Sequence, residues 1–148
     1  MNEEEKIKFT ELSNFFAKQK EALEASKRFK FTLFGGSVGS GKSRWLRWSM
    51  IYWLIKLYDK HDLQGIRAGL FCEDYPSLND RHLTKIKYEF PDWLGVWNQQ
   101  RHEFTLAPEY GSGILAFRNL DDPTKYLSVE FAVMGVDEIN RNPKATFD

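Results

Sequence analysis

The spacing of apolar residues along the chain indicates where helices form. An amphipathic helix is expected over residues 10–26, because apolar side chains recur there at helical intervals, at Leu12, Phe15, Phe16 and Leu23. Across residues 42–59, apolar side chains cover nearly the whole helical circumference, which indicates a helix that packs on more than one side. Residues 77–80 have the Ser-x-x-Asp form of a capping box, and helical spacing continues until Pro91. We therefore expect a further helix with its N-cap at Ser77.

Short apolar runs between these helices predict strands. Residues 31–34 are apolar and end at a pair of glycines, which is typical of a buried strand that enters a tight turn. The other expected strands are residues 66–72 and 129–136, together with a hairpin of residues 103–106 and 114–117 beside the main sheet. Strands that alternate with helices indicate an α/β fold.

The segment between the first expected strand and the helix after it matches a phosphate-binding loop, Gly-x4-Gly-Lys-[Ser/Thr]. Its glycines allow backbone conformations that other residues rarely adopt, so successive N–H groups can converge on phosphate oxygens. The helix N-terminus adds partial positive charge. A flexible loop with an incidental lysine is the alternative, and the position between strand and helix argues against it. We predict a nucleotide-binding loop made of Gly36, Ser37, Val38, Gly39, Ser40, Gly41, Lys42 and Ser43.

Hydrolysis of a bound nucleotide needs further groups around this loop. Lys42 is expected to reach the β- and γ-phosphates and to act in catalysis, and the Ser43 hydroxyl to ligate Mg²⁺. A carboxylate must support the metal, and another group must orient the attacking water. Asp137 and Glu138 follow an apolar run and can supply both, Asp137 as metal ligand and Glu138 as catalytic residue. The alternatives are a strand that ends in solvated acids, and a rival acidic strand end at residues 73–74.

Taken in order, these motifs resemble the ATPase domain of the large terminase subunit, the motor that packages DNA into tailed bacteriophage heads. The resemblance covers roughly residues 12–140. It is carried by Phe16 and Gln19 ahead of the loop, by the loop itself, and by residues 113–123 and 130–138. Only the loop is specific on its own, and the other segments count through their order.

The resemblance implies a P-loop NTPase fold, a three-layer α/β sandwich around a mostly parallel sheet. It implies ATP and Mg²⁺ as cofactors, and ATP hydrolysis that drives viral DNA packaging into procapsids. The implied partners are double-stranded DNA, the small terminase subunit, the portal protein and further copies of the motor in a homo-oligomeric ring. Gln19 matches the family's glutamine that contacts the adenine edge, with an ordinary polar helix residue as an equal alternative.

The chain departs from the family inside the phosphate loop. The family often has an arginine there, where this chain has Val38. The resemblance then implies that another arginine stabilises the charge of the γ-phosphate, and in such motors it can come from the neighbouring subunit. Arg118 is our candidate for this catalytic role, and Arg101 is a second one. An ordinary surface arginine is the alternative for both.

The resemblance also bears on the extent of the domain. In the wider group to which terminases belong, the strand after the acidic pair is inserted between the loop strand and the strand that ends in that pair. Only a short segment follows Glu138. We therefore expect residues 1–148 to be the N-terminal part of a P-loop ATPase domain, incomplete at its C-terminus, with residues 1–9 as a flexible tail and the nuclease domain absent.

Two other functions fit the same motifs. A helicase-like P-loop ATPase shares a glutamine, a phosphate loop and an Asp-Glu pair. A non-catalytic nucleotide-binding module would bind ATP without releasing phosphate. Helicase motifs or a nuclease domain encoded downstream would separate the first of these from a packaging motor.

Composition narrows the remaining classes. The chain has 148 residues, 42% of them hydrophobic, which suits one domain with a filled core. Its formal net charge of +0 gives no sign of broad polyanion binding. An acidic N-terminus and the lack of a long apolar run predict a protein that is neither secreted nor in a membrane, and the resemblance to a phage family implies the host cytoplasm. The single Cys72 fits a reducing compartment, and histidines without a cysteine partner nearby argue against zinc.

Overall fold

The computed structural model describes residues 41–120 and 131–137. The helical elements are α3 (Lys42–His61), α4 (Tyr75–Leu78), the π-helix η1 (Asn79–Leu83), α5 (Ile86–Glu89) and the 3₁₀-helix η2 (Pro108–Tyr110). The strands are β1 (Arg67–Cys72), β2 (Gly95–Asn98), β3 (Glu103–Leu106), β4 (Ile114–Asn119) and β5 (Val133–Asp137). The helix expected at residues 10–26 and the strand expected at 31–34 lie outside the described residues.

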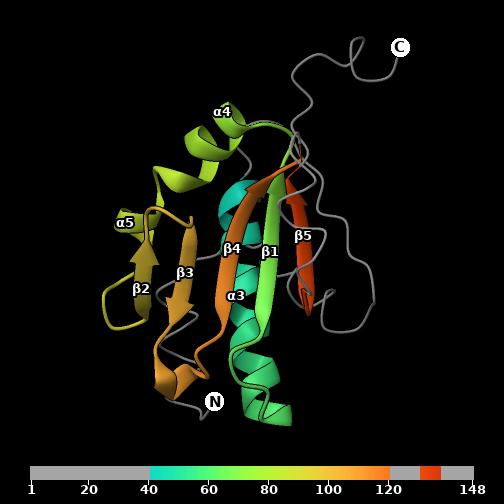
Figure 1. The fold of residues 1–148 in the computed structure, drawn as a ribbon, viewed down its shortest axis with the longest axis vertical. Coiled ribbons are helices and arrows are strands. Elements are labelled where there is room, and N and C mark those ends of the chain that lie inside the picture. Colours follow the sequence, from blue (N-terminus) through green and yellow to red (C-terminus); the bar gives the residue numbers. More distant parts are fainter. Residues whose placement is uncertain (1–40, 121–130, 138–148) are drawn as a thin grey trace.

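The strands form one mixed sheet in the order β2-β3-β4-β1-β5 (Figure 1). Strand β1 runs parallel to both of its neighbours, β4 and β5. Strand β3 pairs antiparallel with β4 and with β2. The predicted α/β class and the antiparallel pairing of β3 with β4 are therefore confirmed, whereas the three-layer sandwich stays a prediction. The expected place of this hairpin beside the main sheet is wrong, because β4 lies inside the sheet and pairs with β1.

Strand β2 was not predicted from the sequence. It is only 4 residues long, and its positions alternate between half-buried and exposed. Glycine and asparagine, which rarely favour strands, occupy its two ends, at Gly95 and Asn98. A side chain at Gly95 would clash with the backbone oxygen of Thr105 on the paired strand, so this position accepts only glycine.

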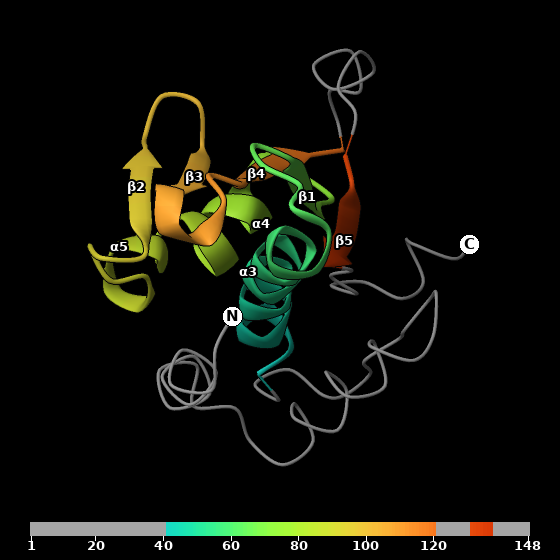
Figure 2. The same cartoon turned by 90° about the horizontal axis from the view of Figure 1, so that it is seen from below.

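Helix α3 lies across one face of the sheet, and the shorter helices α4 and α5 lie on the same side (Figure 2). Helix α3 confirms the helix expected at residues 42–59 and ends slightly later, at His61. The chain leaves it through Asp62 in the left-handed conformation, with φ of 53°. None of the helices in the described ranges combines the length and the apolar character needed to cross a bilayer.

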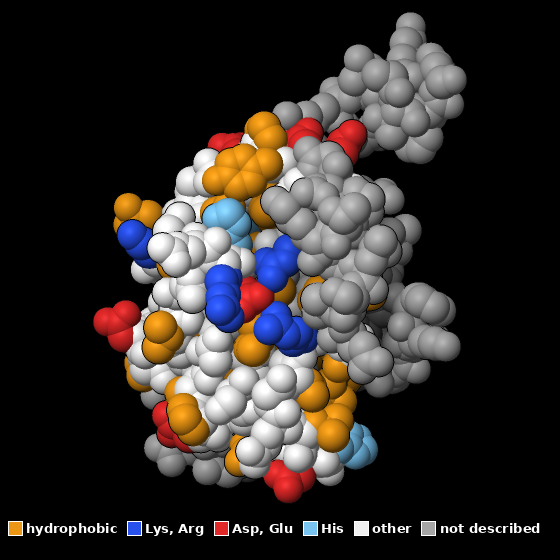
Figure 3. Space-filling model, viewed as in Figure 1, with side chains coloured by type: hydrophobic (Ala, Val, Ile, Leu, Met, Phe, Trp, Pro, Cys, Tyr) orange, Lys and Arg blue, Asp and Glu red, His pale blue; other side chains and the backbone are white. Residues whose placement is uncertain are grey.

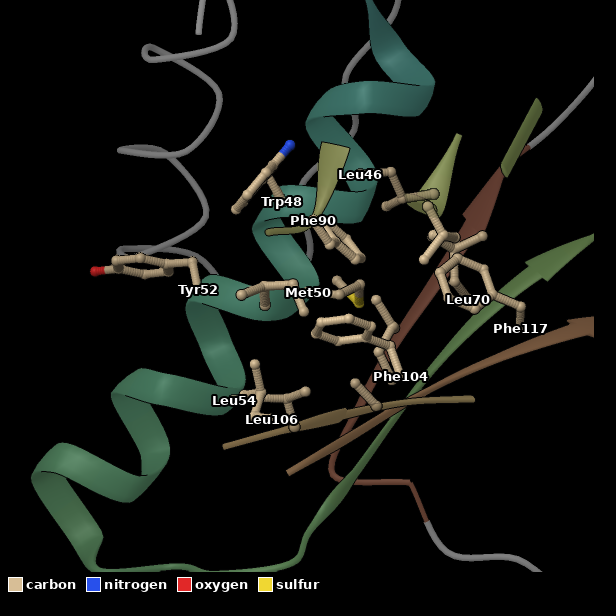
Figure 4. Packing of buried hydrophobic residues seen from close by; sticks show 14 of the residues in the cluster. Leu46, Trp48, Met50, Tyr52, Leu54, Leu70, Phe90, Phe104, Leu106 and Phe117 are labelled. Carbon is tan, nitrogen blue, oxygen red and sulfur yellow. The ribbon is translucent and has the colours of Figure 1, made fainter. Parts of the chain in front are cut away.

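The core lies between α3 and the sheet (Figure 4). Side chains of the helix meet side chains of β1, β3 and β4 there. Trp48 is fully buried and packs edge-on against Phe90, with ring centroids 5.0 Å apart. At Gly135 on β5, a Cβ would lie 2.7 Å from Leu46 Cδ1, so the missing side chain lets β5 approach α3 closely.

The capping box expected at Ser77 is wrong. The carboxylate of Asp74 accepts the backbone N–H of Ser77 at 2.8 Å, so Asp74 is the N-cap and α4 begins at Tyr75. Pro76 fits this arrangement, because proline is favoured in the first turn of a helix. Ser77 is fully buried inside the helix, where a capping residue would not lie. The helix also fails to continue smoothly to Pro91, since a π-helical turn interrupts it.

Strand β5 is shorter than the strand expected at residues 129–136. It runs from Val133 to Asp137, and residues 129–130 lie outside the described part. Asp137 is therefore the last residue of the strand rather than the first residue after it. Gly135 and Asp137 are the buried positions of the strand, whereas Met134 and Val136 face the other side and are 60% and 53% exposed.

The opposite face of the sheet carries an ion-pair cluster of Arg67, Glu103 and Arg118. Glu103 Oε2 accepts hydrogen bonds from Arg67 at 2.9 Å and from Arg118 at 2.6 Å. Figure 3 shows an acidic side chain among basic ones on this face. Burial alone would raise the pKa of Glu103, but the hydrogen bonds and charges of the two arginines outweigh it and hold that pKa below its ordinary value of 4.5.

We predict that Glu103→Gln destabilises the fold at neutral pH by about 1 kcal/mol, since both arginines are partly exposed and screened. A lowered folded-state pKa gives stability that is complete above the unfolded pKa and is lost as the pH falls through the folded value. The difference in unfolding free energy between wild type and variant should therefore disappear at acidic pH. Urea unfolding at neutral and acidic pH measures it, with the exposed Glu109→Gln as control. A gap that stays constant down to acid would contradict this account.

Candidate functional site

The N-terminus of α3 meets the carboxyl end of β5. Gly41 precedes the helix in a left-handed conformation, with φ of 83°, and so turns the chain into its first turn. Ser43, in that turn, donates a hydrogen bond from Oγ to Asp137 Oδ2 at 2.6 Å. Because β1 and β5 are parallel, Asp137 lies beside Cys72 where both strands end. Two segments far apart in the sequence thus place a hydroxyl against a carboxylate.

Asp137 is buried, with 6% of its surface exposed. Burial alone would raise its pKa, but hydrogen bonds from His82 and Ser43 and the charge of Arg81 stabilise the charged form. The pKa of Asp137 consequently lies below its ordinary value. Asp137 is therefore a carboxylate at neutral pH, ready to accept hydrogen bonds or to ligate a cation.

His82, fully buried in the π-helix η1, is the second partner of this carboxylate. Its Nε2 lies 2.8 Å from Asp137 Oδ2, and its Nδ1 lies 3.0 Å from Arg47 Nη1. Burial lowers the pKa of His82 below its ordinary value, even though the hydrogen bond to Asp137 opposes this shift. The imidazole is therefore neutral at pH 7.

Arg47 connects His82 back to α3. It is 3% exposed, and its Nε and Nη2 donate to the two carboxylate oxygens of Glu89 at 2.8 and 2.5 Å. Its Nη1 also donates to the backbone oxygen of Arg81 at 2.6 Å. Arg47 and Glu89 thus form a bidentate, charge-assisted pair, which holds the guanidinium in a fixed orientation.

Cys72 lies next to these groups. Potential ligand atoms of Cys72, His82 and Asp137 all lie within 4.8 Å of one another. The expectation that the histidines have no cysteine partner nearby is therefore wrong. Cys72 is distant from His82 in the sequence but lies close to it in the fold, because β1 brings Cys72 alongside Asp137. Burial, with Asp137 adding to it, raises the pKa of Cys72 to about 12, which disfavours the thiolate that binds zinc. His82 and Asp137 already bond to each other, and we assign no metal to the three.

The Ser43 and Asp137 pair fits Mg²⁺ by the chemistry of its donors. Mg²⁺ prefers oxygen ligands, and one or two protein oxygens commonly hold it together with phosphate oxygens and water. A hydroxyl and a charged carboxylate within 2.6 Å of each other supply such oxygens from two separate elements. Asp137 Oδ1 has Arg81 Nη1 at 3.9 Å, beyond hydrogen-bond distance.

The structure brings some of the predicted site residues together. The start of α3 lies against the carboxyl end of β5, which brings together Gly41, Lys42, Ser43 and Asp137. The remaining nucleotide-binding and catalytic candidates lie outside the described residues: Gln19, Gly36, Ser37, Val38, Gly39, Ser40 and Glu138. In the rival acidic pair at 73–74, Asp74 has a structural role, since it caps α4.

Arg118 is not part of this grouping. It projects from the face of the sheet opposite α3, where it donates to Glu103 and to the backbone oxygen of Arg101. The fold of this chain therefore does not bring it to Ser43 and Asp137. A role in a neighbouring subunit stays a prediction for Arg118 and for Arg101.

Sequence reasoning missed three residues of the site: Arg47, His82 and Glu89. No short motif marks them, because they belong to different elements. One signal was present in the sequence. Arg47 lies four positions after Ser43, on the same side of a helix whose other residues there are mostly apolar. An arginine at such a position requires a buried partner.

No family model, curated protein or solved structure matches this chain. The geometry of the site and the sequence motifs therefore carry the functional argument.

Proposed function

We propose that this chain binds ATP with Mg²⁺ and contributes to ATP hydrolysis. The observation that carries the proposal is the hydrogen bond of 2.6 Å between Ser43 Oγ and Asp137 Oδ2. The last residue of the phosphate-loop pattern and the first acid of the Asp-Glu pair are 94 positions apart in sequence. Their contact at the N-terminus of a 20-residue helix is what a nucleotide and metal site requires.

Each residue has a separate task in this proposal. The first-turn N–H groups of α3 and the Lys42 ammonium bind the phosphates. Ser43 and Asp137 hold the metal, and Glu138 orients the attacking water. Bound Mg²⁺ would neutralise charge on the phosphate oxygens. The sheet order supports a P-loop sandwich, because among the described strands β5 pairs only with β1 and its other edge is available for a further strand.

We propose further that the ATPase belongs to a motor that packages viral DNA. The ordered resemblance to large terminase subunits supports this, and the geometry of the site fits it without selecting it over other P-loop ATPases. Double-stranded DNA, a small terminase subunit, a portal protein and a ring of identical subunits are the proposed partners. A nuclease domain encoded directly downstream would support packaging, and helicase motifs there would contradict it.

Lys42→Ala is expected to weaken ATP binding roughly tenfold to a hundredfold, because a charge-assisted contact contributes about 1.5–3 kcal/mol. Isothermal titration of the chain with Mg-ATP measures the affinity. Lys60→Ala, in the last turn of the same helix, is the matched control and should bind like wild type. Equal affinities for Lys42→Ala and wild type would refute the phosphate-loop assignment.

Glu138→Gln is expected to keep ATP binding and to slow hydrolysis by about 10²–10⁴-fold, since the amide retains the size of the side chain but cannot act as a base. Phosphate release by the assembled motor measures the rate, and titration measures binding. Glu109→Gln controls for the change of charge. Turnover at the wild-type rate would remove Glu138 from the mechanism.

A further inference from the structure

Four side chains form a closed ring that begins and ends on α3. Ser43 donates to Asp137, Asp137 meets His82, and His82 meets Arg47, which lies one helical turn beyond Ser43. Glu89 anchors Arg47 from outside the ring. The ring therefore ties the first turn of α3, the end of β5 and the π-helix η1 to one another.

The chemistry of arginine determines the direction of these hydrogen bonds. A guanidinium has only donors, so Arg47 Nη1 must donate to His82 Nδ1. Nδ1 then carries no proton, and the proton of the neutral imidazole lies on Nε2. Nε2–H accordingly donates to Asp137 Oδ2. Arg47 thus selects the tautomer of His82 that can hold the carboxylate.

We propose that His82 is a positioning residue that fixes the Asp137 carboxylate for Mg²⁺, and that Arg47 and Glu89 hold His82 in the required tautomer. This inference rests on the proposed function. Ser43 and His82 both donate to Oδ2, so the plane of the carboxylate is set from two sides. Partners of this kind behind a metal ligand typically change metal affinity by about 10–100-fold when they are removed.

Stability alone gives a poor account of this ring. Burying Arg47 and most of Glu89 costs desolvation, and apolar residues of similar volume often stabilise a fold as well or better. His82 is 0% exposed and lies beside Phe117, a place that a phenylalanine could fill. The π-helical turn that carries His82 is itself a feature that occurs frequently at functional sites. The polar ring is better explained by the orientation it imposes on Asp137.

The tautomer can be tested in the wild-type chain without nucleotide. Long-range ¹H–¹⁵N NMR spectra distinguish the imidazole nitrogens, and His82→Gln identifies the signals of His82 among the 3 histidines. We expect a neutral ring with the proton on Nε2. A proton on Nδ1 would overturn the inference, because Nε2 could then not donate to Asp137.

Substitutions test the consequence for metal binding. His82→Phe keeps the ring shape but has no donor, whereas the Nε2 of glutamine can replace that of histidine in His82→Gln. Titration of the chain with ATP, in Mg²⁺ and in EDTA, measures how far the metal strengthens binding. His82→Phe should reduce this Mg²⁺-dependent gain at least about tenfold and leave affinity in EDTA unchanged. His82→Gln should retain most of the gain, and the exposed His61→Phe should behave as wild type.

The outcomes separate this inference from the proposed function. Wild type that binds no ATP refutes the proposed function and the inference with it. Wild type that binds Mg-ATP, with a His82→Phe variant that keeps the full Mg²⁺-dependent gain, refutes only the positioning role. Equal losses in Mg²⁺ and in EDTA also refute it, because they indicate general damage to the site. If His82→Phe does not unfold cooperatively, the tautomer spectrum and His82→Gln decide the question.

Discussion

The contact between Ser43 and Asp137 is the constraint on which the site depends. It requires α3 to begin where β5 ends, which in turn requires parallel pairing of β5 with β1 and close packing of β5 on α3. Gly135 permits that packing, because a side chain there would meet Leu46. The apolar core between the helix and the sheet keeps α3 in this position. The hydrophobic packing of the fold therefore sets the distance between the Ser43 hydroxyl and the Asp137 carboxylate.

A buried carboxylate is costly unless its charge is compensated. Asp137 receives that compensation from hydrogen bonds of two neutral donors, Ser43 and His82, and from the charge of Arg81, whose Nη1 lies 3.9 Å from Oδ1. The positively charged Arg47 contacts His82 rather than Asp137, and Glu89 neutralises its charge. Asp137 thus keeps much of its attraction for an added cation. An arginine that donated hydrogen bonds directly to both oxygens of Asp137 would compete with Mg²⁺ more strongly.

Local sequence patterns predicted the elements whose signal lies within a few residues. Helix α3, strand β1 and the hairpin of β3 and β4 follow from apolar spacing and glycine positions. The N-cap of α4 was missed because Asp74-x-x-Ser77 competes with Ser77-x-x-Asp80, and only Pro76 distinguishes the two. Ser43 and Asp137 could be paired from motif order. His82 could not, because its role depends on a π-helical turn and on Arg47, neither of which a motif records.

The most direct test of the central claim is a double-mutant cycle on Ser43 and Asp137, with the Mg²⁺-dependent gain in ATP affinity as the measured quantity. If the two side chains hold one cation, Ser43→Ala and Asp137→Asn should each remove most of that gain, and the double variant should lose little more than either single variant. Losses that simply add, or a gain that survives in both single variants, would show that the two residues do not form a common metal site.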